Sequence, residues 1–294
     1  MPNSKYFGTW GLAFGTWILE FDMKTIGIIA GTGELPKIIA KDARERGLRV
    51  ITAALEDLAP GEMEELSDEL RWINVGKLGE LINMLKQFRV EEAIMAGKVP
   101  KSLLYKAKIT PDLRAVKLLF SLKDKSDDSI LNAITKELEG EGIRIVDTAA
   151  LSPHLLTPEG VLTEDPPSKE EWRDIEFGWK IAKEIGRLDI GQTVVVKGQA
   201  VMAVEAIEGT DEAIRRGGKW AGDSAVVVKV SKPQQDMRLD VPAVGLTTVK
   251  SMVDVTARVL AVEAGKSIII DRGKFIKEAQ EAGISVVGVK DKAI

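Results

Sequence analysis

The chain has 294 residues, of which 45% are hydrophobic and 29% charged, so it is long enough for one large or two ordinary globular domains and too apolar for a disordered protein. The formal net charge of −4 disfavours a protein that coats nucleic acid, and the lack of cysteine excludes disulfides, thiolate nucleophiles and cysteine-ligated metal sites. The single histidine, His154, excludes a mechanism that needs two imidazoles.

Residues 1–22 form an apolar leader with two of the six tryptophans. Three interpretations fit it: an upstream-start artefact before a domain that begins at Met23, a signal peptide, and an interfacial anchor. A signal peptide is disfavoured because the stretch lacks a strongly basic start and an Ala-x-Ala-like end. Glu20 interrupts the apolar run, which is short for a membrane span. We treat 1–22 as a leader or extension and leave its status open.

The first half alternates between strand patterns and helix patterns. Apolar runs predict strands at 24–30, 50–55, 72–75, 90–97 and 143–149. Helical periodicity predicts helices at 35–46, 78–88 and 130–142, the last one capped by the Asp127-Asp128-Ser129 stretch. Strands that alternate with helices indicate β-α-β units, so we expect a parallel sheet over this half.

The second half is predicted to be mixed α/β. The proline-rich stretch 151–168 reads as a connecting segment that packs on the protein. Strands at 193–197 and 200–207 flank a Gly-Gln turn, which predicts a hairpin. Helices are expected at 169–185, 247–256 and 274–282, and a further helix is expected to begin with Thr210 or Asp211 as its cap. Strands are expected at 225–230, 259–264, 267–271 and 285–289.

Glycine turns follow two of the predicted parallel strands. Gly31-Thr32-Gly33 lies between a strand and a helix, a geometry that can hold a phosphate at the helix N-terminus. Gly97 and Lys98 follow another strand, and both turns could lie at the carboxyl edge of one sheet, where ligands of open α/β sheets bind. Plain strand-to-helix turns and a surface lysine remain the alternative. A dinucleotide site is disfavoured because Pro36 replaces the third glycine.

Acidic residues end two apolar strands. Glu205 lies among apolar neighbours and therefore needs a partner, which could be Lys197 across the hairpin, a metal ion or a substrate hydroxyl. Glu263 repeats the same Ala-Val-Glu-Ala pattern. The repetition favours one polar pocket that contains both carboxylates.

The stretch 232–241, KPQQDMRLDV, collects charges in a loop bounded by prolines. Asp236 and Asp240 could hold Mg²⁺, which prefers oxygen ligands, while Lys232 and Arg238 could balance and grip phosphate. A bound metal ion would polarise the phosphorus and orient water. The alternative is a solvated loop with exposed ion pairs that contribute little stability, and the loop alone does not decide between the two.

Several motifs in a fixed order resemble a known family. They are IAGTGELP, MAGKV, the Asp127-Asp128 helix start, DIGQTVVVKGQAVMAVEAIEGTD, KPQQDMRLDVPAVG and VEAG. Together they are similar to the LpxI-type UDP-2,3-diacylglucosamine pyrophosphatases of lipid A biosynthesis, and the resemblance extends from about Met23 to Val289. No single motif is specific, but the combination is.

The resemblance implies a fold, a reaction and a cellular place. It implies a Rossmann-like, substrate-nucleotide-binding α/β domain with a parallel sheet over 23–155, a mixed α/β hydrolase domain over 156–294, and an active site between them. The implied reaction is the magnesium-dependent hydrolysis of UDP-2,3-diacylglucosamine to UMP and 2,3-diacylglucosamine 1-phosphate (lipid X). A cytoplasmic homodimer that works peripherally at the inner face of the inner membrane, with no nucleic-acid partner, is also implied.

The resemblance also implies roles for residues. One aspartate, Asp240 or Asp236, is expected to be essential, and the tighter local motif favours Asp240. Asp240, Asp236 and Glu205 are the expected ligands of Mg²⁺. The expected substrate-binding residues are Gly31, Thr32, Gly33, Gly97, Lys98, Lys197, Gln199, Thr210, Lys232 and Arg238. The alternatives are a nucleotide or lipid carrier without turnover and an NAD-dependent oxidoreductase, the latter based on the glycine turn and on Glu56 and Asp57.

Overall fold

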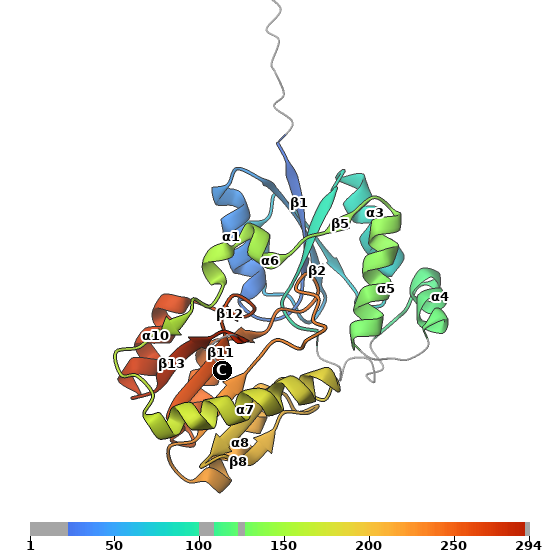
Figure 1. Cartoon of the computed structure of the whole chain (residues 1–294). Helices are drawn as coiled ribbons and strands as arrows, with labels where there is room; N and C mark the ends of the chain where they lie inside the picture. Colours follow the sequence, from blue (N-terminus) through green and yellow to red (C-terminus); the bar gives the residue numbers. More distant parts are fainter. Residues whose placement is uncertain (1–22, 100–108, 123–126, 292–294) are drawn as a thin grey trace, which may run out of the picture.

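The computed structural model describes residues 23–99, 109–122 and 127–291. The leader at 1–22 lies outside the described residues. The chain forms two halves, each built around its own β-sheet, and the long loop after β9 lies between them (Figure 1). This arrangement confirms the predicted mixed α/β class.

The N-terminal half contains a five-stranded, all-parallel sheet in the order β3-β2-β1-β4-β5. Its buried strands are apolar because helices cover both faces. The strands are β1 (Thr25–Ala30), β2 (Arg49–Leu55), β3 (Glu69–Ile73), β4 (Glu92–Ala96) and β5 (Arg144–Ile145). The helices are α1 (Leu35–Glu45), α2 (Met63–Leu66), α3 (Leu78–Gln87), α4 (Leu113–Ser121), α5 (Asp127–Gly140) and α6 (Thr148–Leu151).

The C-terminal half contains a six-stranded sheet in the order β6-β13-β11-β9-β7-β8. The three strands β9, β11 and β13 are parallel, whereas β7 runs antiparallel to β8 and β9, and β6 runs antiparallel to β13. The strands are β6 (Gly160–Val161), β7 (Thr193–Lys197), β8 (Ala200–Val204), β9 (Val226–Lys229), β11 (Val259–Glu263) and β13 (Ser285–Val289).

Helices cover the two faces of this second sheet at close range. A long helix, α7 (Lys169–Arg187), packs on one face, and Gly178 allows the approach because a Cβ there would lie 2.9 Å from Val228. The opposite face is covered by α8 (Thr210–Ala221), α9 (Leu246–Val253) and α10 (Arg272–Glu281). Gly217 has the same function in α8, since a Cβ would lie 2.6 Å from Val195.

The two halves share packed side chains. A small parallel sheet pairs β10 (Ala243–Val244) with β12 (Ile268–Ile269), and Ile268 is buried in the same core as Ile26 and Ile94 of the first sheet. On the other face of the first sheet, Leu239 packs against the core beneath α3 and α5. Val241, in the loop that follows β9, packs against the first of these cores. Since Leu239 lies in the same loop, the loop contacts the N-terminal half from both sides.

Most predicted elements are confirmed, and the errors lie at short or irregular ones. The strand predicted at 72–75 is β3, which begins three residues earlier, and the strand predicted at 143–149 is only the two-residue β5 followed by α6. The hairpin is confirmed, but β8 ends at Val204, before Glu205. The cap of α8 is Gly209, and Thr210 is its first helical residue.

The connecting segment packs on the protein, as predicted, and it contacts both halves. It contains a single turn of 3-10 helix, η2 (Pro153–Leu155), and the edge strand β6. Leu155 is buried, and Leu156 pairs with Ile268. Across the three described stretches, no helix combines the length and the apolar character needed to cross a membrane.

Candidate active site

Two of the predicted glycine turns meet at the carboxyl edge of the first sheet. The chain leaves β1 toward β2 on one side, while β4 lies on the other side, so the loops after β1 and β4 are neighbours. Thr32 and Lys98 exchange backbone hydrogen bonds of 2.9 and 3.0 Å, and the Gly31 N–H donates to the Ala96 carbonyl at 2.8 Å. This is the point in an open α/β sheet where ligands bind.

The glycines are required by the contact between these two loops. A Cβ on Gly31 would lie 2.7 Å from the Lys98 carbonyl oxygen. A Cβ on Gly97, whose φ is +91°, would lie 2.6 Å from the Thr32 carbonyl oxygen. Gly33 differs because the space beside it is open, although its φ of +103° also favours glycine. The glycine pattern that suggested a phosphate site is thus explained in part by backbone packing.

A buried lysine lies at the carboxyl end of β9. Lys229 is only 4% exposed, and its Nζ donates to the Thr210 hydroxyl at 2.6 Å. That hydroxyl donates to Glu205 Oε1 at 3.0 Å, and the Gln192 N–H donates to Glu205 Oε2 at 3.3 Å. We call the three side chains the Lys229–Thr210–Glu205 chain. It gives a buried cation a carboxylate partner through one hydroxyl, as a buried charge requires.

Charges from both halves act on this lysine. Burial lowers the pKa of Lys229, the nearby carboxylates of Glu205, Asp240 and Asp211 oppose this shift, and the Lys98 ammonium adds to it. Asp240 and Lys98 therefore lie close enough to Lys229 for their charges to be felt. The site unites the loop after β4, the end of β9 and the loop before β10, and it offers two cations beside a carboxylate.

Gln192 adds an unsatisfied polar group at this end of β7. Its side-chain Oε1 is buried and, within the described residues, has no hydrogen-bond partner. Its backbone N–H already contacts Glu205. Since buried acceptors are rarely left unpaired, a water molecule or a bound ligand is expected to donate to this oxygen.

Sequence reasoning missed Lys229, although a signal was present. The lysine interrupts the apolar run AVVVKV at 225–230, as Glu205 interrupts its own strand pattern. A charged residue at the end of a buried strand needs a partner, and the argument made for Glu205 applies equally to this lysine. Its partner proved to be the predicted site residue Thr210.

In the loop at 232–241, most charges are paired with protein groups. Arg238 donates to both oxygens of Asp236, at 3.0 Å from Nε and 2.7 Å from Nη2, and its Nη1 donates to Glu139 of α5 at 3.0 Å. The hydrogen bond from Arg238 lowers the pKa of Asp236. Lys232 forms an ion pair with Asp189. Asp236, Arg238 and Lys232 therefore bind protein partners, and Arg238 connects the two halves.

Asp240 has a different environment from Asp236. It is exposed, and its Oδ2 accepts a hydrogen bond of 2.7 Å from Gln235 Nε2. The charge of Asp240 is among those that oppose the lowering of the pKa of Lys229. Of the two aspartates between which the sequence did not decide, Asp240 is the better candidate for a role at the Lys229 site, because Arg238 binds both oxygens of Asp236.

Two predicted substrate-binding residues lie at the opposite end of the second sheet. Lys197 ends β7, which runs antiparallel to β9, and its ammonium donates to Asp223 Oδ1 at 2.7 Å. Gln199 follows it in the turn, and its N–H donates to Asp174 at 2.6 Å. The proposed pairing of Glu205 with Lys197 is wrong, because Glu205 follows β8 at the far end of the hairpin and bonds to Thr210.

Glu205 and Glu263 share a sheet edge but not one pocket. Glu263 ends β11 on the face covered by α7, where it accepts hydrogen bonds from Lys183 at 2.6 Å and from the Ser231 N–H at 2.8 Å. Glu205 lies on the face covered by α8. The two carboxylates are therefore separated by the sheet itself. The bond to Ser231 lets Glu263 anchor the start of the loop that carries Asp240.

The three expected metal ligands do not form a ready-made metal site. Throughout the described residues, no three His, Asp or Glu side chains are grouped so that they could hold an ion. Asp236 is engaged by Arg238, and Glu205 by Thr210 and Gln192. Asp240 alone fits the arrangement in which Mg²⁺ takes one or two carboxylates and completes its shell with water and substrate phosphate oxygens.

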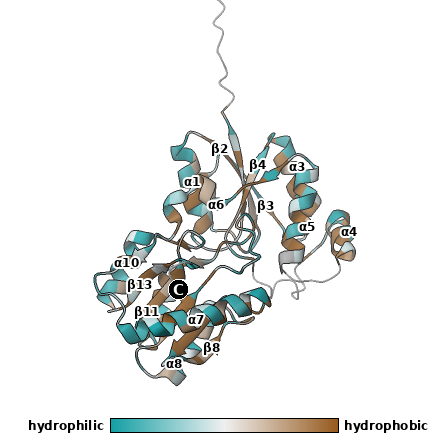
Figure 2. Ribbon diagram, viewed as in Figure 1, coloured by the Kyte–Doolittle hydropathy of each residue, from teal (hydrophilic) through white to brown (hydrophobic). Residues whose placement is uncertain are grey.

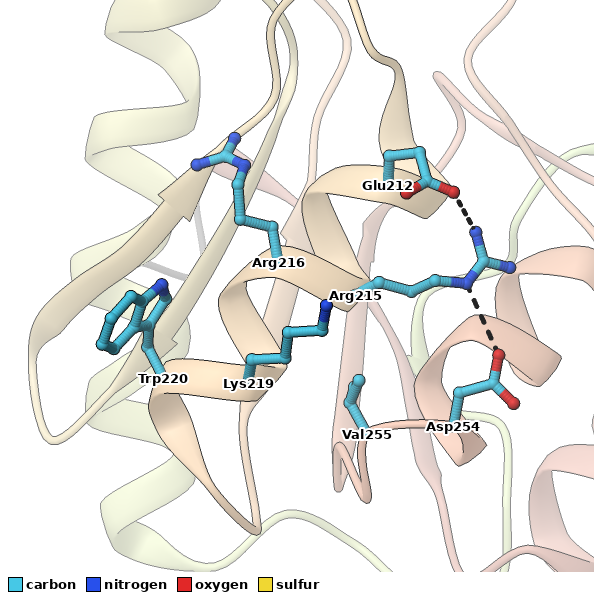
Figure 3. Close-up of a pocket in the computed structure, with 7 residues that line it drawn as sticks. All are labelled: Glu212, Arg215, Arg216, Lys219, Trp220, Asp254 and Val255. Atoms are coloured by element: carbon cyan, nitrogen blue, oxygen red, sulfur yellow. Dashed lines mark hydrogen bonds and ion pairs between the residues drawn. The ribbon is translucent and has the colours of Figure 1, made fainter.

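A surface hollow of about 600 Å³ lies on the outer side of α8 (Figure 3). Both carboxylates of the hollow are paired with Arg215, which bonds to Glu212 at 2.5 Å and to Asp254 at 3.4 Å. The inner side of α8 packs on the sheet, so this hollow is separated from Lys229 by the helix. It contains none of the site residues predicted from the sequence, and we assign the site to the Lys229 region.

Comparison with known proteins decides the family. The LpxI N-terminal domain model matches residues 25–155, and the LpxI C-terminal domain model matches residues 158–287. The chain belongs to the LpxI family. A curated relative, the UDP-2,3-diacylglucosamine pyrophosphatase LpxI of Caulobacter vibrioides, is 31% identical over 278 residues, which cover 91% of this chain and 98% of the relative. The resemblance read from the motifs is confirmed.

Solved structures add no functional information. Phosphoribosylglycinamide synthetase from Anaerococcus prevotii aligns with 59% of this chain and 31% of its own, at 15% identity and a TM-score of 0.23. The biotin carboxylase domain of the Hydrogenobacter thermophilus 2-oxoglutarate carboxylase aligns with 68% of this chain and 40% of its own, at 14% identity and a TM-score of 0.26. Neither score supports an inference.

Proposed function

We propose that the protein hydrolyses the pyrophosphate bond of UDP-2,3-diacylglucosamine, a step of lipid A biosynthesis. The proposal rests on two matches. The N-terminal and C-terminal LpxI domain models match the chain in order, and the alignment with the curated LpxI of that activity covers 98% of that relative. In the reaction, water adds to one phosphorus and the bridging P–O bond breaks. The products are UMP and 2,3-diacylglucosamine 1-phosphate, and two protons are released when both phosphate monoesters are fully ionised.

The geometry at the Lys229 site suits this chemistry. A pyrophosphate carries negative charge that grows on the departing phosphate, and fixed cations stabilise it best. Lys98 would approach from the N-terminal half and Lys229 from the C-terminal half, where the hydroxyl of Thr210 holds the ammonium in place. Asp240, on the exposed side, would orient the water. Because the cations come from different halves, both must be in position before the substrate is held.

Mg²⁺ belongs to this proposal as a partner of the substrate. Asp240 would hold it together with phosphate oxygens, and the ion would supply charge neutralisation and polarise the phosphorus. In the N-terminal half, we infer that the Rossmann-like parallel sheet receives the nucleotide at the β1–β4 crevice, beside Gly33 and the start of α1. Contact with the inner face of the inner membrane and a homodimeric state are part of the same proposal.

The test is a product analysis. Purified protein is incubated with UDP-2,3-diacylglucosamine and Mg²⁺, with and without EDTA, and the products are identified by mass spectrometry. The proposal expects UMP and 2,3-diacylglucosamine 1-phosphate in equal amounts, and loss of both with EDTA. Tight substrate binding without products would instead identify a carrier, and turnover that EDTA leaves unchanged would remove the metal from the proposal.

A further inference from the structure

The helix α4 exposes large apolar side chains on one face. Leu113 is 81% exposed and Phe120 is 87% exposed, and the exposed Lys117 lies between them. Positions i, i+4 and i+7 share one side of a helix, so the three form a single stripe. The opposite side of α4 is already in use, since Ala115 and Leu118 are buried in the core of the N-terminal half.

Nothing in the described structure covers this stripe. In Figure 1, α4 lies at the outer edge of the N-terminal half, beyond α5 and away from both sheets. Figure 2 shows hydrophobic and hydrophilic residues side by side on it. Within the helix, Asp112 caps the N-terminus through the Ala115 N–H, and Arg114 bonds to Glu137 and Glu141. The helix is therefore held firmly while its apolar stripe is presented outward, as at a contact surface.

The charge of the surrounding sequence indicates the partner. Residues 98–125 contain eight lysines or arginines against two aspartates, a net charge of +6, whereas the whole chain has −4 and the remainder therefore −10. Residues 100–108 and 123–126 lie outside the described structure and enter only through this count. Apolar side chains together with a local excess of lysine are the signature of segments that bind the surface of anionic bilayers.

We propose that the stripe Leu113–Lys117–Phe120 of α4 docks the protein on an anionic lipid bilayer. Leu113 and Phe120 enter the region between headgroups and acyl chains, and Lys117 remains at the level of the phosphates. A second copy of the chain is a poorer occupant, because a two-fold contact through this stripe would bring two segments of +6 together. The purpose of the docking rests on the proposed function, since a diacyl substrate resides in a membrane, but the docking itself is measured without substrate.

The experiment is co-sedimentation of the full chain with vesicles, in parallel with size-exclusion chromatography. Vesicles contain either phosphatidylglycerol with phosphatidylethanolamine or phosphatidylcholine alone, at about 0.05 M and about 0.5 M NaCl. The test variant is Leu113→Ser with Phe120→Ser, and Lys117→Glu tests the charge. Trp220→Ser removes a comparably exposed aromatic side chain (78%) from α8, and Trp10→Ser with Trp17→Ser tests the leader. Circular dichroism checks that each variant is folded.

The proposal expects binding to phosphatidylglycerol vesicles that weakens at high salt. It expects the Leu113/Phe120 variant to lose about tenfold or more in the vesicle partition coefficient, because two large apolar groups no longer leave water. Lys117→Glu should reduce binding several-fold, and Trp220→Ser should bind as the wild type does. Loss of binding only in the leader variant would overturn the proposal. The proposal would also be overturned if the wild type did not bind vesicles and eluted as a dimer while the Leu113/Phe120 variant eluted as a monomer.

Discussion

The Lys229–Thr210–Glu205 chain makes a prediction about stability that does not depend on the reaction. In Lys229→Met, Glu205 keeps its hydrogen bonds from Thr210 and Gln192 but loses the buried cation that compensates its charge. In Glu205→Gln, the amide oxygen still accepts from Thr210, while Lys229 is left buried without a carboxylate. Each variant leaves one buried charge unpaired, which costs about 3 kcal/mol.

The double variant should cost less than the sum of the two single variants. When Lys229→Met and Glu205→Gln are combined, both side chains are neutral, and the remaining loss is one hydrogen bond to a charged group, about 1.5–3 kcal/mol. The coupling energy between the two positions is therefore about 3 kcal/mol, well above the error of such cycles. Urea unfolding of the four proteins at pH 7, with equal m-values, measures it directly.

A matched control comes from the other end of the same sheet. Lys197→Met removes a lysine whose ion-pair partner, Asp223, is mostly exposed, so the expected loss is about 1 kcal/mol or less. If the free-energy costs of Lys229→Met and Glu205→Gln add within about 0.5 kcal/mol in the double variant, the two side chains do not stabilise each other. A cost for Glu205→Gln no larger than that for Lys197→Met would show that Lys229 is neutral in the native protein.

Two further predictions concern the junctions of the fold. Gly31→Ala would place a Cβ 2.7 Å from the Lys98 carbonyl oxygen, so we expect the free energy of unfolding, measured in urea, to fall by about 1–3 kcal/mol. The control Gly140→Ala, where the space beside the glycine is open, should change it by no more than about 0.5 kcal/mol. Equal effects of the two substitutions would contradict the packing argument. Because Arg238 lowers the pKa of Asp236, their pair stabilises the native state fully above about pH 4 and loses this contribution as pH falls through the lowered pKa. Asp236→Asn should therefore have a free energy of unfolding at most about 1 kcal/mol below that of the wild type at pH 7, and this difference should disappear near pH 2. A difference that grows as the pH falls would contradict this prediction.

Regular elements were predictable because each carries its own period. The strands around Ile28, Val195 and Val287 read as apolar runs, and the helix with Trp179 reads as an amphipathic one, so local pattern and tertiary packing agree there. The short β5 could not be separated from the turn into α6, since two residues carry no period. The small α4 was missed because its apolar residues lie on both of its sides.

The site was predictable as a set of candidates but not as an arrangement. The glycine turns and Thr210 were found because strand ends and helix starts can be read from the sequence. Lys197 lies at the opposite end of the sheet from Lys229 because β7 and β9 are antiparallel, and this depends on pairing between strands far apart in the chain. The bond from Arg238 to Glu139 likewise joins residues on different halves, and no local pattern encodes it.

The central claim is that the pyrophosphate is cleaved at the site formed by Lys229 and Asp240. Its most direct test compares the wild-type protein with Asp240→Asn under single-turnover conditions. We expect the wild type to convert UDP-2,3-diacylglucosamine with Mg²⁺ to UMP and 2,3-diacylglucosamine 1-phosphate. We expect Asp240→Asn to bind the substrate but to form both products at least about 100-fold more slowly. Undiminished turnover by Asp240→Asn, or UDP as the nucleotide product of the wild type, would contradict it.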